Sequence, residues 1–165
     1  MRYILSVLTV LAVALSLSAC DGPRPSDAEI IARFRVNRAQ IEQLMAMMRS
    51  DRVLTRVDDN WTDPEDPTTV GISHERIAEY RRILNTIGFP RGFYYDPKSG
   101  RVKFMAWAVG LVVGGAAKSL IYLPEAPPPG PLVADLDAYQ RPPEQSYILV
   151  YRHIEGPWYL ELDAS

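Results

Sequence analysis

The chain has few of the residue types that build metal sites and covalent catalytic centres. Its 165 residues include one cysteine and two histidines. A lone cysteine cannot form an internal disulfide or a cysteine-based zinc site. Neither histidine belongs to a His-Glu-x-x-His pattern, which is typical of zinc hydrolases. The sequence therefore predicts no metal centre and no cofactor.

A strong excess of charge of one sign is also missing. The 18 lysines and arginines nearly balance the 20 acidic residues, which gives a formal net charge of −2. Nucleic-acid-binding domains carry a strongly basic surface. The composition therefore argues against nucleic acid as a partner.

An export signal is present at the N-terminus. Arg2 supplies a short positive region, an apolar run extends from Ile4 to Leu17, and small residues precede Cys20. This order is typical of secretory signal peptides. The apolar run is shorter than the roughly 20 residues that a membrane span requires.

The residues Leu17-Ser18-Ala19-Cys20 resemble the lipobox of bacterial lipoproteins. The resemblance covers residues 1–20 and implies cleavage before Cys20, a diacylglyceryl group on its thiol and acylation of its new amino group. Two or more acyl chains hold a protein stably on a membrane. Asp21 resembles the inner-membrane retention signal of enterobacterial lipoproteins, which favours the inner membrane over the outer one. An ordinary secretory signal or an uncleaved anchor is the alternative.

These features predict three parts of the chain. Residues 1–19 are the signal peptide, residues 20–25 are the lipidated N-terminus with a short tether, and residues 26–165 are a single domain. Extended backbone spans at most about 3.6 Å per residue, so this tether holds the domain close to the membrane. We expect the protein in the bacterial cell envelope, lipid-anchored and facing the periplasm.

Two helices are expected in the first part of the domain. Ser26-Asp27-Ala28-Glu29 has the pattern of a capping box, and apolar residues recur after it at helical spacing. They predict a helix over about 27–49. Ser73 precedes a second apolar stripe that ends before Gly88, which predicts a helix over about 74–87.

Apolar residues alternate along several later segments, as is typical of strands. The predicted strands cover residues 53–57, 93–95, 102–107, 116–123, 147–154 and 158–163. The apolar run 104–117 is too short to cross a membrane and is interpreted as two buried strands with a glycine bend. Five prolines within 124–131 predict an extended strap. The fold class expected is α+β, with two helices packed on a mainly antiparallel sheet of about 4–6 strands.

Two groups of side chains are candidate sites. Tyr159, Tyr151 and Trp107 are predicted as a possible binding surface on the sheet for a glycan or a protein. Aromatic packing inside the domain is the alternative. The acidic loop 58–66 has five carboxylates that could serve as calcium ligands. The EF-hand template fails there because Asp63 stands where glycine is required, so a solvated turn is favoured.

No motif of a catalytic centre is evident. Gly-x-Ser-x-Gly is absent, and residues 110–115 lack the lysine of a phosphate-binding loop. The function expected is a non-catalytic interaction or accessory module, bound to the membrane through acyl chains on Cys20 and to an envelope protein partner. An envelope hydrolase acting on a glycan or lipid is one alternative, and it needs a cleft joining His153 or the acidic loop to a serine or carboxylate. A binder of small apolar ligands is the other, and it needs an enclosed apolar cavity.

Overall fold

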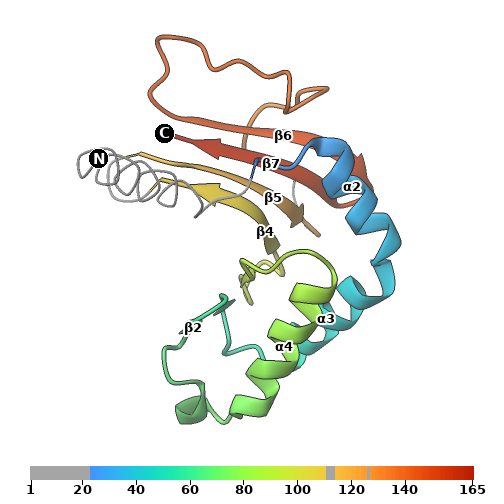
Figure 1. The fold of residues 1–165 in the computed structure, drawn as a ribbon, viewed down its shortest axis with the longest axis vertical. Helices are drawn as coiled ribbons and strands as arrows, with labels where there is room; N and C mark the ends of the chain where they lie inside the picture. Colours follow the sequence, from blue (N-terminus) through green and yellow to red (C-terminus); the bar gives the residue numbers. More distant parts are fainter. Residues whose placement is uncertain (1–22, 111–113, 126) are drawn as a thin grey trace, which may run out of the picture.

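The computed structural model describes residues 23–110, 114–125 and 127–165 (Figure 1). The predicted signal peptide and Cys20 lie outside the described residues. None of the described helices has both the length and the hydropathy of a membrane span.

The described residues have an α+β fold, as predicted. The helices are α2 (Asp27–Val36), α3 (Arg38–Ser50), the short 3-10 helix η1 (Pro67–Val70) and α4 (His74–Thr86). The strands are β1 (Arg56–Val57), β2 (Thr62–Asp63), β3 (Phe93–Tyr95), β4 (Val102–Val109), β5 (Ala116–Tyr122), β6 (Ile148–Glu155) and β7 (Trp158–Ala164). They form one antiparallel sheet of seven strands in the order β2-β1-β3-β4-β5-β7-β6. The helices follow one another in a curve from the β6–β7 end of the sheet toward β2 (Figure 1).

The helix predicted over 27–49 is interrupted at Asn37. The capping box is present at Ser26, and the N-terminus of the helix is confirmed. Asn37 has φ −106° and ψ 25°, outside the helical region, and its side-chain amide donates to the Arg33 carbonyl oxygen at 2.9 Å. Asparagine side chains compete in this way with the regular helix ladder. The chain therefore changes direction between α2 and α3.

The sheet has one strand more than the 4–6 predicted because β2, which is only two residues long, was not predicted. So short a strand has no alternation that could be recognised in the sequence. Only Arg56–Val57 of the predicted strand 53–57 is a strand, and β2 lies within the acidic loop that was predicted as a turn. Gly92 permits β3 to pair with β1, since it has φ +81° and a Cβ there would lie 1.8 Å from the Val57 carbonyl oxygen.

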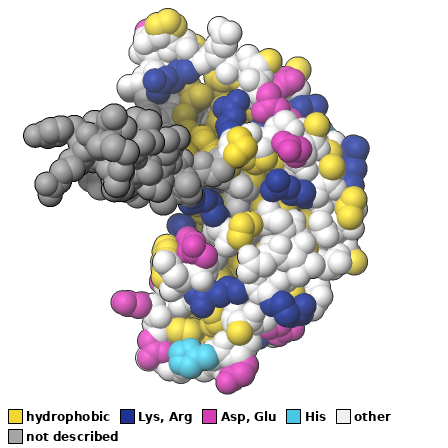
Figure 2. Space-filling model, in the orientation of Figure 1, with side chains coloured by type: hydrophobic (Ala, Val, Ile, Leu, Met, Phe, Trp, Pro, Cys, Tyr) yellow, Lys and Arg dark blue, Asp and Glu magenta, His cyan; other side chains and the backbone are white. Residues whose placement is uncertain are grey.

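The two faces of the sheet have different surroundings. Leu120, Trp158 and Leu160 are buried in the core on the inner face, the face on which the helices pack. The Phe34 ring of α2 lies 4.7 Å from the Trp158 ring. Side chains alternate along each strand, so Glu161 points to the opposite, outer face. Cationic and acidic side chains are interspersed on the side of the molecule seen in Figure 2, in keeping with the small net charge.

A long connection, residues 123–147, joins β5 to β6 although β7 lies between them. It contains the proline-rich segment 124–131. At the free edge of β6, the Val133 N–H donates to the Tyr151 carbonyl oxygen at 2.8 Å, and the Tyr151 N–H donates to the Pro131 carbonyl oxygen at 2.9 Å. An unpaired strand edge invites association with other chains, and this bridge covers the edge of β6 at Tyr151.

Candidate functional site

The three aromatic residues predicted as a binding surface do not lie together. Tyr151 and Tyr159 point to the outer face, where Tyr151 is fully buried. Burial and the neighbouring Glu161 carboxylate raise the pKa of the Tyr151 phenol. A β-bulge between Met105 and Trp107 shifts the register, so Trp107 pairs with Lys118 and shares the inner face with it. Strict alternation along the strand would have placed Trp107 on the outer face.

The acidic loop 58–66 is held by bonds within its own region. Asp58 Oδ2 lies 2.9 Å from the Arg56 guanidinium, and Asp63 Oδ2 accepts a 2.6 Å hydrogen bond from Thr55. Asp66 accepts hydrogen bonds from the Thr68 hydroxyl and N–H, which lower the pKa of the Asp66 carboxyl. These carboxylates are engaged separately and do not converge on one cation position. This geometry favours the turn over the calcium site.

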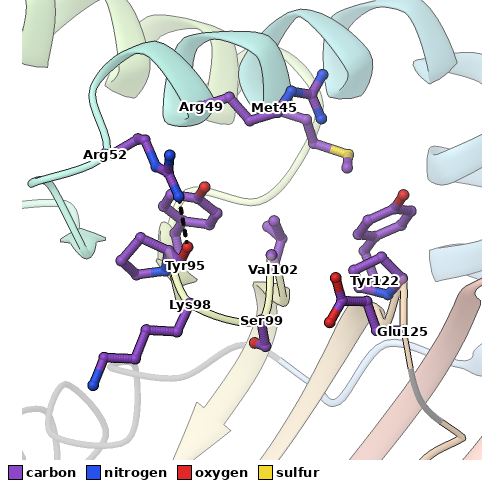
Figure 3. Close-up of a pocket in the computed structure, with 12 residues that line it drawn as sticks. Met45, Arg49, Arg52, Tyr95, Lys98, Ser99, Val102, Tyr122 and Glu125 are labelled. Carbon is purple, nitrogen blue, oxygen red and sulfur yellow. Dashed lines mark hydrogen bonds between the residues drawn. The ribbon is translucent and has the colours of Figure 1, made fainter.

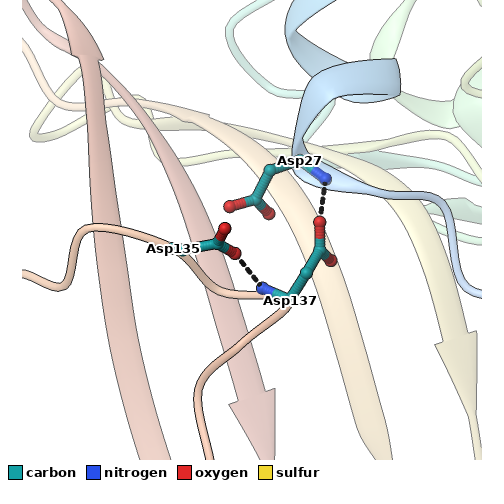
Figure 4. Close-up of side chains that lie close together, drawn as sticks. All are labelled: Asp27, Asp135 and Asp137. Carbon is teal, nitrogen blue, oxygen red and sulfur yellow. Dashed lines mark hydrogen bonds between the residues drawn. The ribbon is translucent and has the colours of Figure 1, made fainter.

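A different acidic cluster joins the start of α2 to the connection between β5 and β6 (Figure 4). Carboxylate oxygens of Asp27, Asp135 and Asp137 lie within 4.8 Å of one another. The Lys118 ammonium lies 2.6 Å from Asp27 Oδ1 and 2.6 Å from Asp137 Oδ1. Arg152 approaches Asp27 Oδ2 at 2.7 Å. Arg24 also lies 3.8 Å from Asp137 Oδ1, and Asp135 Oδ1 accepts from the N–H groups of Asp137 and Ala138, so the cluster is a network of ion pairs and hydrogen bonds that does not need a metal.

This network ties the predicted tether to the sheet. Lys118 Nζ donates to the Pro25 carbonyl oxygen at 3.0 Å, and the Asp27 N–H donates to Asp137 Oδ2 at 2.7 Å. Burial would raise the pKa of Asp137, but the bonds from Lys118 and the Asp27 N–H outweigh it and hold that pKa below its usual range. The chain thus enters the domain at a fixed place on the inner face of β5.

A groove lies between α3 and the ends of β4 and β5 (Figure 3). Its larger hollow has a volume of about 420 Å³ and is lined by Met45, Arg49, Arg52, Tyr95, Pro97, Lys98, Ser99, Gly100, Val102, Tyr122, Pro124 and Glu125. A smaller hollow of about 280 Å³ shares Met45, Arg49 and Tyr122 with it and adds Arg38, Glu42, Pro157 and Trp158. The two hollows together are called the α3 groove below.

The turn between β3 and β4 holds one side of the α3 groove. Asp96 accepts hydrogen bonds from the Ser99 hydroxyl at 2.7 Å and the Lys98 N–H at 2.9 Å, and these bonds lower the pKa of Asp96. Gly100 has φ +70°, a conformation that favours glycine. The Arg52 guanidinium donates to the Pro97 carbonyl oxygen at 3.0 Å across the groove (Figure 3). The turn is therefore fixed relative to the end of α3.

Cations dominate the rim of the groove. Arg38 is paired with Glu42 at 3.0 Å and with Glu155 at 2.8 Å. In contrast, the side chains of Arg49 and Lys98 have no hydrogen bond or ion pair within the described part of the chain. Glu125 is the only acidic residue that lines the larger hollow. The rim therefore has positive charge that the domain itself does not neutralise there.

The lining of the groove suits binding better than catalysis. No histidine lines either hollow, and His153 is exposed on β6, where its Nε2 lies 3.0 Å from the Gly156 carbonyl oxygen. The Ser99 hydroxyl is occupied by Asp96. The floor is formed by half-buried Tyr122 together with the largely buried Met45 and Tyr95, and apolar and aromatic residues commonly line sites that recognise ligands or proteins.

The α3 groove could not be found from the sequence because its walls come from distant segments. Residues 38–52, 95–102, 122–125 and 157–158 meet only in the folded chain. The one local signal was the methionine run beginning at Met45, since methionine is common on adaptable binding surfaces. No family model, curated protein or solved structure matches the chain.

Proposed function

We propose that the protein is a lipid-anchored, non-catalytic interaction module of the bacterial cell envelope that faces the periplasm and receives a protein partner in the α3 groove. The observation that carries the proposal is the groove itself, which combines an apolar and aromatic floor with unneutralised cations at its rim. Arginine and aromatic residues are enriched in the contact regions of protein interfaces. Asp21 favours the inner membrane as the site of anchoring.

The position of the groove relative to the tether supports this proposal. Lys118 binds Pro25 at one point of β5, and Tyr122, which lines the groove, follows four residues later, a distance of about 13 Å along the strand. The ten residues of α2 span about 15 Å and lead from the tether to Arg38 at the other hollow. The groove is therefore separated from the attachment point and would stay accessible above a membrane.

Site-specific photo-crosslinking in the native bacterium tests the groove as a binding site. A photoreactive p-benzoylphenylalanine at position 125 replaces Glu125 and leaves the rim cations intact. The matched control carries it at position 78, because Ala78 is exposed on α4 and does not line the groove. We expect a discrete protein adduct from position 125 only. Equal adducts from both positions, or none from either, would contradict the proposed function.

Metabolic labelling with palmitate tests the anchor. Cys20→Ser should abolish incorporation of the label and leave the unprocessed precursor, because the thiol is the acyl acceptor that the lipobox resemblance implies. Ser18→Ala is the control and should keep both labelling and processing, since a small residue remains before the cleavage site. Label that persists in Cys20→Ser would show that the lipid is attached elsewhere or that the resemblance misleads.

The two alternative functions receive less support. The hydrolase required a cleft joining His153 or the acidic loop to a serine or carboxylate, and neither histidine lines the two hollows of the α3 groove. The binder of small apolar ligands required an enclosed apolar cavity. The α3 groove instead has Arg49, Arg52 and Lys98 along its border.

A further inference from the structure

The charges around the α3 groove indicate what kind of partner segment it accepts. Arg49, Arg52 and Lys98 line the larger hollow against one carboxylate, that of Glu125. The whole chain is slightly acidic, so this excess of cations is local and does not reflect composition. Complementary charge across an interface steers association and selects partners. An occupant with carboxylates would supply the counter-charges that the rim lacks.

The shape of the groove adds a second constraint. The two hollows share Met45, Arg49 and Tyr122 and so adjoin each other; Lys98 lines only the larger one and Trp158 only the smaller one. An extended peptide points successive side chains to opposite sides. One set of alternate side chains would therefore face the floor at Met45, Tyr95 and Tyr122, and the other would face the rim.

We infer that the occupant of the α3 groove is an extended segment of a partner protein in which acidic residues alternate with apolar ones. The apolar side chains pack mainly on half-buried Tyr122, beside the edges of Met45 and Tyr95, and the carboxylates pair with Arg49 and Lys98. Arg52 already donates to the Pro97 carbonyl oxygen, and its guanidinium adds positive charge to the rim. The inference rests on the proposed function and adds the chemistry of the partner to it.

Synthetic peptides test this chemistry on the full, processed and lipidated protein in non-ionic detergent. The probe is a fluorescein-labelled heptapeptide in which Glu alternates with Leu and Phe, and its counterpart has Lys in place of every Glu. Fluorescence anisotropy should give saturable binding of the acidic peptide, about tenfold or more tighter than the basic one. Added salt should weaken this binding because exposed charges are screened. Equal affinities, or no saturable binding of the acidic peptide, would overturn the inference.

Charge reversal on the rim provides the second measurement. The double variant Arg49→Glu/Lys98→Glu should bind the acidic peptide about tenfold or more weakly than the wild-type protein does. A tenfold loss of affinity corresponds to a modest change in binding free energy. Arg82→Glu is the matched control, since Arg82 is exposed on α4 and does not line the groove. Thermal melting checks folding, and Lys98→Gln serves as a milder variant that should lose part of the affinity. Unchanged affinity in a folded rim variant refutes the inference.

The two proposals can fail separately. An adduct at position 125 together with no preference for the acidic peptide leaves the interaction module standing and removes its acidic partner. An adduct that contains glycan or lipid instead of protein would likewise refute the acidic segment. No adduct above the position 78 control removes the proposed function itself, whatever the peptide does.

Discussion

The inner side of the domain has two groups of cations that differ in how they are neutralised. Lys118 is fully buried and contacts the carboxylates of Asp27 and Asp137. Arg49 and Lys98 on the rim of the α3 groove are exposed, and their side chains have no hydrogen bond or ion pair within the described residues. The first arrangement fixes the chain, and the second leaves charge available to a partner. Equal substitutions in the two groups should therefore affect different properties.

The largest effect is expected from Lys118→Met. The substitution keeps much of the side-chain volume but leaves Asp27, whose side chain is 2% exposed, with one cationic partner fewer. Breaking a buried ion pair by removing one partner costs about 3–5 kcal/mol. Urea denaturation should show a loss of that order in the free energy of unfolding. A loss below about 1 kcal/mol, the range of exposed pairs, would contradict the role given to the network.

A smaller, pH-dependent effect is expected from Asp137→Asn. The pKa of Asp137 is lowered in the folded protein, so its ionised form adds stability above the unfolded pKa of about 3.9. That stability is lost as the pH falls through the lower, folded pKa. Asp137→Asn should cost about 1 kcal/mol at pH 7, because its side chain is partly exposed, and should flatten the decline of stability in acid. Melting curves from pH 7 to about pH 2 would measure both, and an unchanged acid profile would refute the assignment.

The smallest effect on stability is expected from Lys98→Met, the counterpart of Lys118→Met on the rim. Lys98 is exposed and its ammonium has no partner in the described part of the chain. Surface substitutions of this kind usually change stability by less than about 0.5 kcal/mol. Its melting curve should match that of the wild-type protein while binding of the acidic peptide weakens. A large loss of stability would contradict the distinction between the buried Lys118 network and the exposed cations of the rim.

Local signals predicted the ends of helices and the longer strands. Ser26 and Ser73 both cap helices at the positions expected, because capping depends on residues only three apart. The interruption at Asn37 was missed, since the apolar spacing of the two helices runs on as if one helix continued. The antiparallel pair of β4 and β5 agrees with the two strands expected over 104–117. Residues 111–113, between these strands, are not among the described residues.

The features that the sequence could not predict depend on contacts between distant segments. Lys118 directly follows the apolar run 104–117, yet it is buried within β5 because Asp27 and Asp137 reach it from other segments. Trp107 changed faces because of a bulge that no residue pattern announces. The α3 groove was not predicted for the same reason, because the segments that line it are distant in the sequence and meet only in the folded chain.

The place of β7 in the sheet has a consequence for how the protein is made. β7 follows every other strand in the sequence but lies between β5 and β6, next to one edge of the hydrogen-bonded sheet. A ribosome delivers the chain from its N-terminus, so the strands on either side of β7 emerge before it. The pairing of β5 with β7 joins residues as distant as Ala116 and Ala164 and must await the last strand. Until β7 arrives, the growing chain exposes open strand edges, and chaperones would have their longest opportunity to bind it at that stage.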